Sequence, residues 1–186
     1  MNEGLIARRY AKALLKYAQE KDKPLPVYEA ARQVEASFIA RPDLQEALLN
    51  PVLSAGEKEA LMLSAAGVDA ASSEEYLRFA RLLLHERRED HLRQIMLMYQ
   101  KIYRDVNHIV RAQIITAAPL DKKILSRIEA IIEQHCPGAR LEFEHMVDPG
   151  IIGGFVLNVG GEQLDASLEK ELKQLRLKLI NSKTRL

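Results

Sequence analysis

The chain has 186 residues, of which 47% are hydrophobic and 28% charged, a balance that is typical of a soluble globular protein and too apolar for a disordered one. The net charge of +1 lacks the cationic surplus of a dedicated nucleic-acid binder, and the single cysteine, Cys136, excludes an internal disulfide. The length allows one large domain or two small ones, and no run of about 18 apolar residues is present that could span a bilayer.

The first part of the chain shows helical spacing of its apolar residues almost throughout, and six helices are predicted. The first contains Ile6 to Tyr17, the second follows Pro26, and the third ends at Asn50-Pro51. The other three are a helix from a capping box of Ser54 and Glu57 to Gly67, one from a box of Ser72 and Glu75 through His85, and one from about Asp90 to Asp105. Their short connections predict an antiparallel six-helix bundle over residues 1–106.

The hydrophobic period changes from helical to alternating near Asn107. Alternation predicts strands at 108–117, 141–147, 151–159 and 163–165, with Gly160-Gly161 as a hairpin turn between the last two. Asp121 caps a helix that stops at Cys136, and Ser167 caps a last helix that reaches about Ile180. The predicted fold class is therefore mostly α, with the six-helix bundle followed by a small α+β domain over residues 107–186.

The sequence contains no arrangement that predicts catalysis, a cofactor or a metal. His85-Glu86 resembles the start of a zinc-protease motif, but the second histidine four residues later is missing. His85 and His91 are six residues apart, about 240° around a helix, so one metal could not use both. The glycines between Gly150 and Gly161 match neither common phosphate-binding pattern.

Two of the predicted helices carry wider apolar arcs than a surface helix of a bundle needs. In the first, the polar side chains are confined to Arg8, Arg9, Lys12, Lys16 and Gln19. In the fifth, they form a single row of Glu74, Arg78, Arg81 and His85. Either both helices are central in the bundle, or they border a groove for a partner.

Three segments resemble the delta subunit of F-type ATP synthase and its mitochondrial counterpart, the oligomycin sensitivity-conferring protein. The first is Ile6 to Leu14, and the second is Phe79 to Arg88, in which Arg87 stands where the family usually has glycine. The clearest is the Asp148 to Val156 segment followed by Leu164 to Leu168, similar to the family's glycine-pair and Asp-x-Ser signature. The likeness covers the whole chain in the right order.

The resemblance implies a non-catalytic stator connector that resists rotary torque in proton-driven ATP synthesis. The bundle is then expected to receive an N-terminal helix of an alpha subunit in a groove between helices 1 and 5, with walls at Tyr10, Ala13, Leu14, Tyr17, Phe79 and Leu83. The second domain is expected to meet the b subunits of the peripheral stalk through Gly153, Gly154, Phe155, Leu168, Leu172, Leu175 and Leu179. The chain would lie on the cytoplasmic face of the cell membrane, held there only by the complex.

Two alternatives stay open at this stage. The glycine pair could serve a bulge within the small domain's own packing, because glycine in a strand often marks a close backbone approach. The basic residues of the terminal segment could make the chain a helical RNA- or ribosome-associated protein, although a solvated helix face is the commoner explanation of Lys170, Lys173, Arg176, Lys178, Lys183 and Arg185.

Overall fold

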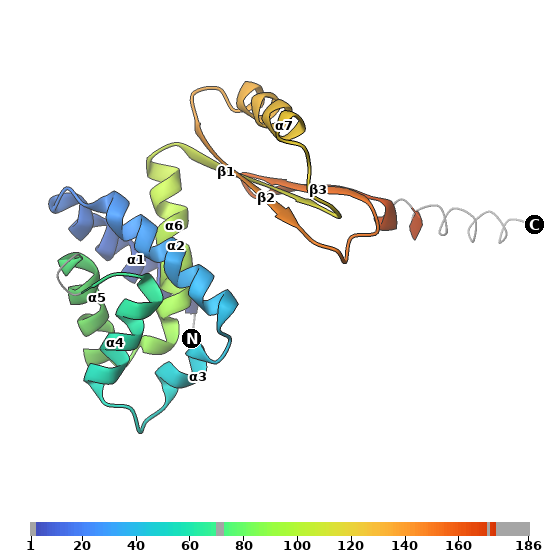
Figure 1. Cartoon of the computed structure of the whole chain (residues 1–186). Helices are drawn as coiled ribbons and strands as arrows, with labels where there is room; N and C mark the ends of the chain where they lie inside the picture. The colour runs from blue at the N-terminus through green and yellow to red at the C-terminus, as the bar shows by residue number, and fades with distance from the viewer. Residues whose placement is uncertain (1–2, 70–72, 171, 174–186) are drawn as a thin grey trace, which may run out of the picture. The chain divides into compact units, whose positions relative to one another are not determined.

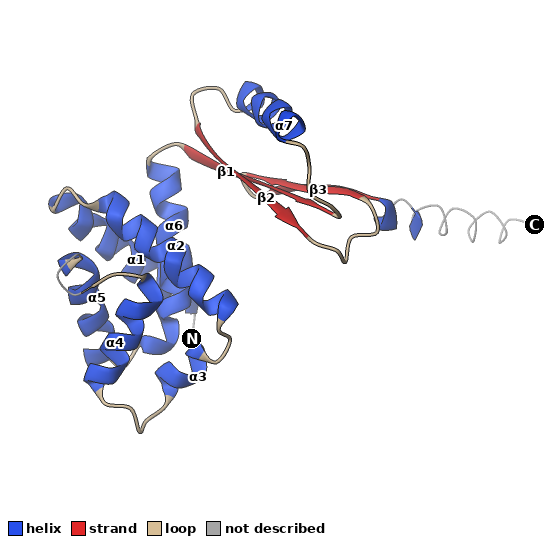
Figure 2. Cartoon of the chain, viewed as in Figure 1, coloured by secondary structure: helices blue, strands red, loops and turns tan. Residues whose placement is uncertain are grey.

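The computed structural model describes residues 3–69, 73–170 and 172–173, and it divides the chain into two compact units, residues 1–106 (unit 1) and 107–186 (unit 2). The described part is mostly helical and contains one small sheet, as Figure 1 and Figure 2 show. The sheet has four strands. The mostly α fold class with a small α+β portion is confirmed at this level.

Unit 1 contains helices only, within the residues that are described. Between α5 and α6 the chain makes one 3₁₀ turn, η1, so the predicted sixth helix begins as a tighter turn. The elements are α1 (Glu3–Glu20), α2 (Pro24–Ala40), α3 (Leu44–Leu49), α4 (Ala55–Ala66), α5 (Glu74–His85), η1 (Glu89–His91) and α6 (Leu92–Val106).

The ends of α4 follow the local signals in the sequence. The Ser54 hydroxyl accepts a hydrogen bond from the Glu57 backbone N–H at 3.3 Å, and the Glu57 carboxylate accepts one from the Ser54 backbone N–H at 2.8 Å. The hydrogen bonds from Ser54 lower the pKa of the Glu57 carboxyl. Gly67 ends the helix with φ at +64°, a left-handed conformation that costs glycine little.

The N-terminal end of α5 is the place where a capping box of Ser72 and Glu75 was predicted. Ser72 lies outside the described residues, the N-cap of the helix is Ser73, and no side chain caps it. Glu75 is 4% exposed, and its carboxylate lies 3.7 Å from the Lys23 ammonium group. Glu75 thus links the start of α5 to Lys23, which precedes α2.

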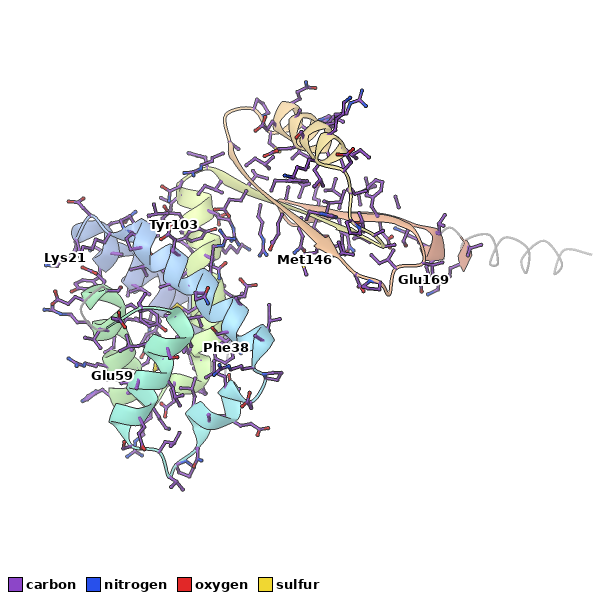
Figure 3. All side chains as sticks on the ribbon, viewed as in Figure 1. Lys21, Phe38, Glu59, Tyr103, Met146 and Glu169 are labelled. Carbon is purple, nitrogen blue, oxygen red and sulfur yellow. The ribbon has the colours of Figure 1, made fainter. Side chains whose placement is uncertain are left out.

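The core of unit 1 lies between α6 and the helices α1 and α2 that contact it. Ile95, Met96 and Tyr99 of α6 are completely buried. Tyr103, which Figure 3 labels, belongs to the same helix. Its ring stacks on that of Tyr28 of α2, with ring centroids 4.3 Å apart. Gln100, also buried, donates a hydrogen bond of 3.1 Å to the Ala31 carbonyl. Because a buried amide without a partner would be costly, this bond fixes the register of α6 on α2.

Unit 2 is a four-stranded sheet with the strand order β2-β1-β3-β4 and one described helix of more than a single turn. The β1 and β2 strands are parallel and α7 connects them, whereas β3 pairs antiparallel with both β1 and β4. The third strand starts three residues later than predicted, and the fourth is longer. The elements are β1 (Ile109–Thr116), α7 (Lys122–His135), β2 (Arg140–Val147), β3 (Gly154–Val159) and β4 (Glu162–Ser167).

The register places many of the apolar residues of the four strands on one side of the sheet. Ile114 pairs with His145 of β2 and with Leu157 of β3, and Leu157 pairs with Leu164 of β4. Paired residues face the same side of a sheet. We call this side the apolar sheet face. Its β1 members Ala112 and Ile114 are buried, as is Ile132 of α7, whereas Leu164 at the β4 edge is 57% exposed.

Candidate partner-binding surfaces

The accessible side of α1 carries a row of apolar and aromatic side chains, which we call the α1 row. It consists of Ile6, Tyr10, Ala13 and Tyr17, spaced at i, i+4, i+7 and i+11, so the four residues lie along one line of the helix. Ala13 is exposed, and the other three are half-buried. The α1 row is therefore accessible to a partner.

The neighbouring helix α5, which contacts α1, adds two residues to this surface. Leu82 is 46% exposed, and Arg78 reaches Tyr17 of the α1 row. The Glu74 carboxylate, 2.6 Å from the Arg78 guanidinium, raises the pKa of Arg78 further above its ordinary value, and Tyr17 adds to this effect. Sequence reasoning missed Leu82, whose only signal was its position beside the polar row of α5.

Three of the six predicted groove walls are core residues in the structure. Leu14, Phe79 and Leu83 are 3%, 5% and 0% exposed. A wide apolar arc contains both the stripe that a helix buries in its own domain and any stripe that it keeps for a partner, and spacing alone does not separate the two. The accessible part of the predicted site is thus Tyr10, Ala13 and Tyr17.

A second groove lies between the N-terminal turns of α1 and the middle of α6, with a volume of about 430 Å³. Small residues on α1, Gly4 and Ala7, make room for it, and mainly apolar side chains of α6 form the opposite wall. This groove was not predicted from the sequence, because it depends on how two helices pack. Its α6 residues are Gln94, Leu97, Met98 and Lys101.

In unit 2, the glycine pair that was predicted to meet the stalk, Gly153 and Gly154, contacts other residues of the same unit. Gly154 has φ at +79°, and a β-carbon there would clash with the Ala166 carbonyl oxygen of β4. The Gly153 carbonyl accepts a hydrogen bond from the Leu168 backbone N–H at 3.0 Å. The pair therefore allows the end of β4 to approach β3 closely, which is the reading that the sequence left open.

The remaining predicted stalk residues differ in their accessibility. Phe155, on the apolar sheet face, is half-buried, while Leu168 and Leu172 are 46% and 58% exposed. Leu175 and Leu179 lie outside the described residues.

The Asp-x-Ser segment at the end of β4 starts a turn of helix. The Asp165 carboxylate accepts a hydrogen bond from the Ser167 backbone N–H at 3.0 Å, and Ser167 lowers the pKa of this carboxyl. The Ser167 hydroxyl in turn accepts a bond from the Lys170 backbone N–H at 3.4 Å. Ser167 thus acts as a helix cap, as the sequence predicted, and the motif serves local structure.

The described ranges contain no group of three or more His, Cys, Asp or Glu side chains placed to hold a metal ion. No helix within them is both long and apolar enough to cross a membrane.

Comparison with known proteins decides the family. The model of the ATP synthase delta (OSCP) subunit family matches residues 6–179. The chain belongs to this family. An ATP synthase subunit delta from Bacteroides thetaiotaomicron is 39% identical over 186 residues, which is 100% of both chains. One from Nostoc punctiforme is 34% identical over 182 residues, 95% of each chain.

A solved structure shares the fold of this delta-family chain. A chain of the Toxoplasma gondii mitochondrial ATP synthase hexamer superposes with a TM-score of 0.65, covering 97% of this chain and 98% of that one at 20% identity. The resemblance stated from the sequence is confirmed, and so is the prediction of a structural rather than catalytic subunit. The comparisons give no support to an RNA- or ribosome-associated protein.

Proposed function

We propose that this delta-family chain is the stator connector that joins the alpha subunits of the ATP synthase head to the b subunits of the peripheral stalk. The observation that carries the proposal is the match over the full length of the chain to proteins named ATP synthase subunit delta. A connector has to bind at two places, and each unit presents accessible apolar side chains of its own. Its task is to transmit reaction torque through binding free energy, on the cytoplasmic face of the membrane that carries the complex.

In unit 1, the head-binding surface is the α1 row together with Leu82. An amphipathic helix, such as the alpha-subunit N-terminal helix, could lay its apolar face along this line of Tyr10, Ala13 and Tyr17. Ala13 is at the middle of the row and is the smallest of its members, so it marks the place where a partner backbone can come closest.

In unit 2, the stalk-binding surface is the accessible apolar edge near the end of β4. Leu164, Leu168 and Leu172 are each about half exposed, at 57%, 46% and 58%. An apolar helix end of a b subunit would remove these side chains from water, at roughly 25 cal/mol per Å² of apolar surface buried. Gly153 and Gly154 contribute indirectly, by holding β4 close to β3.

The head-binding half is tested with the substitution Ala13→Asp. A carboxylate in an apolar interface loses its hydration without gaining a partner, so affinity for an alpha-subunit N-terminal peptide should fall at least tenfold, equivalent to about 1.4 kcal/mol. The measurement is calorimetric titration of the intact chain. The matched control is Ala36→Asp, an exposed alanine of α2, and circular dichroism verifies that both variants are folded. Equal affinity of all three proteins for the peptide would refute this half of the proposal.

The stalk-binding half is tested with Leu172→Asp. A point substitution is preferred to deletion of residues 167–186, because the deletion would also remove Ser167, which pairs with Gly154 in the sheet. The variant should lose capture of b-subunit chains and keep the alpha peptide affinity. Ile124→Asp, at a 47% exposed apolar position on α7, serves as the control. Undiminished capture by Leu172→Asp would place the stalk surface elsewhere on the chain.

A further inference from the structure

The charge around the α1 row is one-sided. The exposed face of α1 carries Arg8, Arg9, Lys12 and Lys16, and no acidic residue occurs between Gly4 and Gln19. This contrasts with the net charge of +1 for the whole chain. Arg9, Ala13 and Lys16 follow the i, i+4, i+7 spacing, so the two cations directly border the apolar line of the row.

The α1 cations are available for a partner, within the part of the chain that the structure describes. None of them forms an ion pair there. The Arg9 guanidinium lies 5.6 Å from the centre of the Tyr10 ring, which keeps one positive charge against the row itself.

On the opposite wall, the charges of α5 are already paired. Arg78 binds Glu74 at 2.6 Å, and Arg81 binds Glu59 of α4 at 2.8 Å. Glu75 is buried and faces Lys23. The unbalanced positive charge therefore lies along the α1 edge of the surface and not along the α5 edge.

We infer that this surface takes an amphipathic helix whose apolar stripe is bordered by carboxylates on the side that faces α1. The inference rests on the proposed function and adds the chemistry of the partner: Arg9 and Lys16 select an acid-edged helix and fix which of its sides meets α1. A helix with lysines at the same positions binds more weakly because of like-charge repulsion. Exposed pairs contribute modestly to affinity, and charge complementarity acts mainly on orientation and on the rate of association.

The test uses the intact chain and two designed peptides with the same apolar stripe, one edged by glutamate and the other by lysine. The acid-edged peptide should bind roughly tenfold more tightly at low salt, because several exposed pairs of a few-fold each act together. This preference should fade as the Debye length falls from about 30 Å at 0.01 M to about 3 Å at 1 M salt. The double variant R9E/K16E should reverse the preference, and R9Q/K16Q should abolish it.

The matched control is the double variant R32E/R93E, which makes the same charge change at exposed positions of α2 and α6 and should keep the preference. Equal binding of the two peptides, binding of neither, or a preference that survives R9E/K16E would overturn the inference. The alpha-subunit N-terminal peptide is titrated in parallel. If Ala13→Asp weakens its binding while R9E/K16E does not, the proposed function stands and only the inference fails. If neither Ala13→Asp nor R9E/K16E weakens binding of the alpha-subunit peptide, both the proposed head-binding surface and the inference are contradicted.

Discussion

The two units differ in how completely each encloses its own core. In unit 1, α6 packs against α1 and α2, and even its buried amide Gln100 has partners on α2. In the described residues of unit 2, the apolar side chains that are fully buried are only Ala112, Ile114 and Ile132. Within the described part of unit 2, α7 is the one helix of more than a single turn beside the four-stranded sheet, and Leu164 on the apolar sheet face is 57% exposed.

This difference predicts two modes of binding. Unit 1 has a well-buried core and presents the α1 row on its surface, so a partner would bind to a domain that is already folded. Unit 2 has apolar surface left over at β4, and a partner would complete its core. A domain of fewer than about 100 residues buries a smaller fraction of its surface than a larger one, so it gains more from such completion.

The largest effect should come from separating the units. Residues 1–106 alone should unfold in one cooperative thermal transition and still bind the alpha peptide. Residues 107–186 alone should bind the dye ANS and show a broad transition, because few of their described apolar side chains are buried. Circular dichroism and ANS fluorescence measure both. Two equally sharp transitions would remove the contrast between the units.

A smaller effect is expected at the glycines of unit 2. Gly154→Ala is destabilised in two ways, by the left-handed backbone conformation and by the clash with Ala166. Gly161→Ala, at φ +100°, has open space around it and is destabilised only by the backbone conformation. We expect roughly 1–2 kcal/mol of strain in each variant and a further 1–3 kcal/mol of overpacking at Gly154 only.

Hydrogen exchange of the β3 and β4 amides in the intact chain measures the difference. Equal losses of protection in the two alanine variants would show that the close approach of β4 to β3 adds no cost. The glycine pair would then be free to serve the stalk contact directly.

How much was predictable from the sequence depends on the range of the interaction involved. The Ser54 cap, the Gly67 stop and the Asp121 cap of α7 involve residues within one turn of each other, and the structure has all three. The ion pair of Glu75 with Lys23 was not predicted, because Lys23 is 52 positions away in the sequence and belongs to another helix boundary. Local motifs cannot anticipate such a long-range pair.

The site shows the same limit. Helical spacing identified α1 and α5 as unusually apolar, but it could not divide Leu14 from Ala13, since adjacent residues of one arc face the core and the solvent. The parallel pairing of β1 with β2 was not predicted either, because alternation gives the faces of a strand and not its neighbours. The excess positive charge on the α1 side of the surface was not predictable either, because it depends on the ion pairs that Arg78 and Arg81 of α5 form in the folded chain.

The smallest expected effect concerns the pH dependence of unit 2. Hydrogen bonding from Ser167 lowers the pKa of Asp165 in the folded chain. The ionised carboxylate therefore stabilises the fold fully above its unfolded pKa of about 3.9, and this contribution is lost as the pH falls through the lower folded value. Asp165→Asn keeps an oxygen that can accept from Ser167 but removes the charge. The wild-type chain should melt at a slightly higher temperature than the variant at pH 7, by an amount that is constant down to about pH 5 and shrinks below about pH 4. Thermal melts across this range, followed by circular dichroism, measure it, and a difference that grew on acidification would contradict the assigned direction.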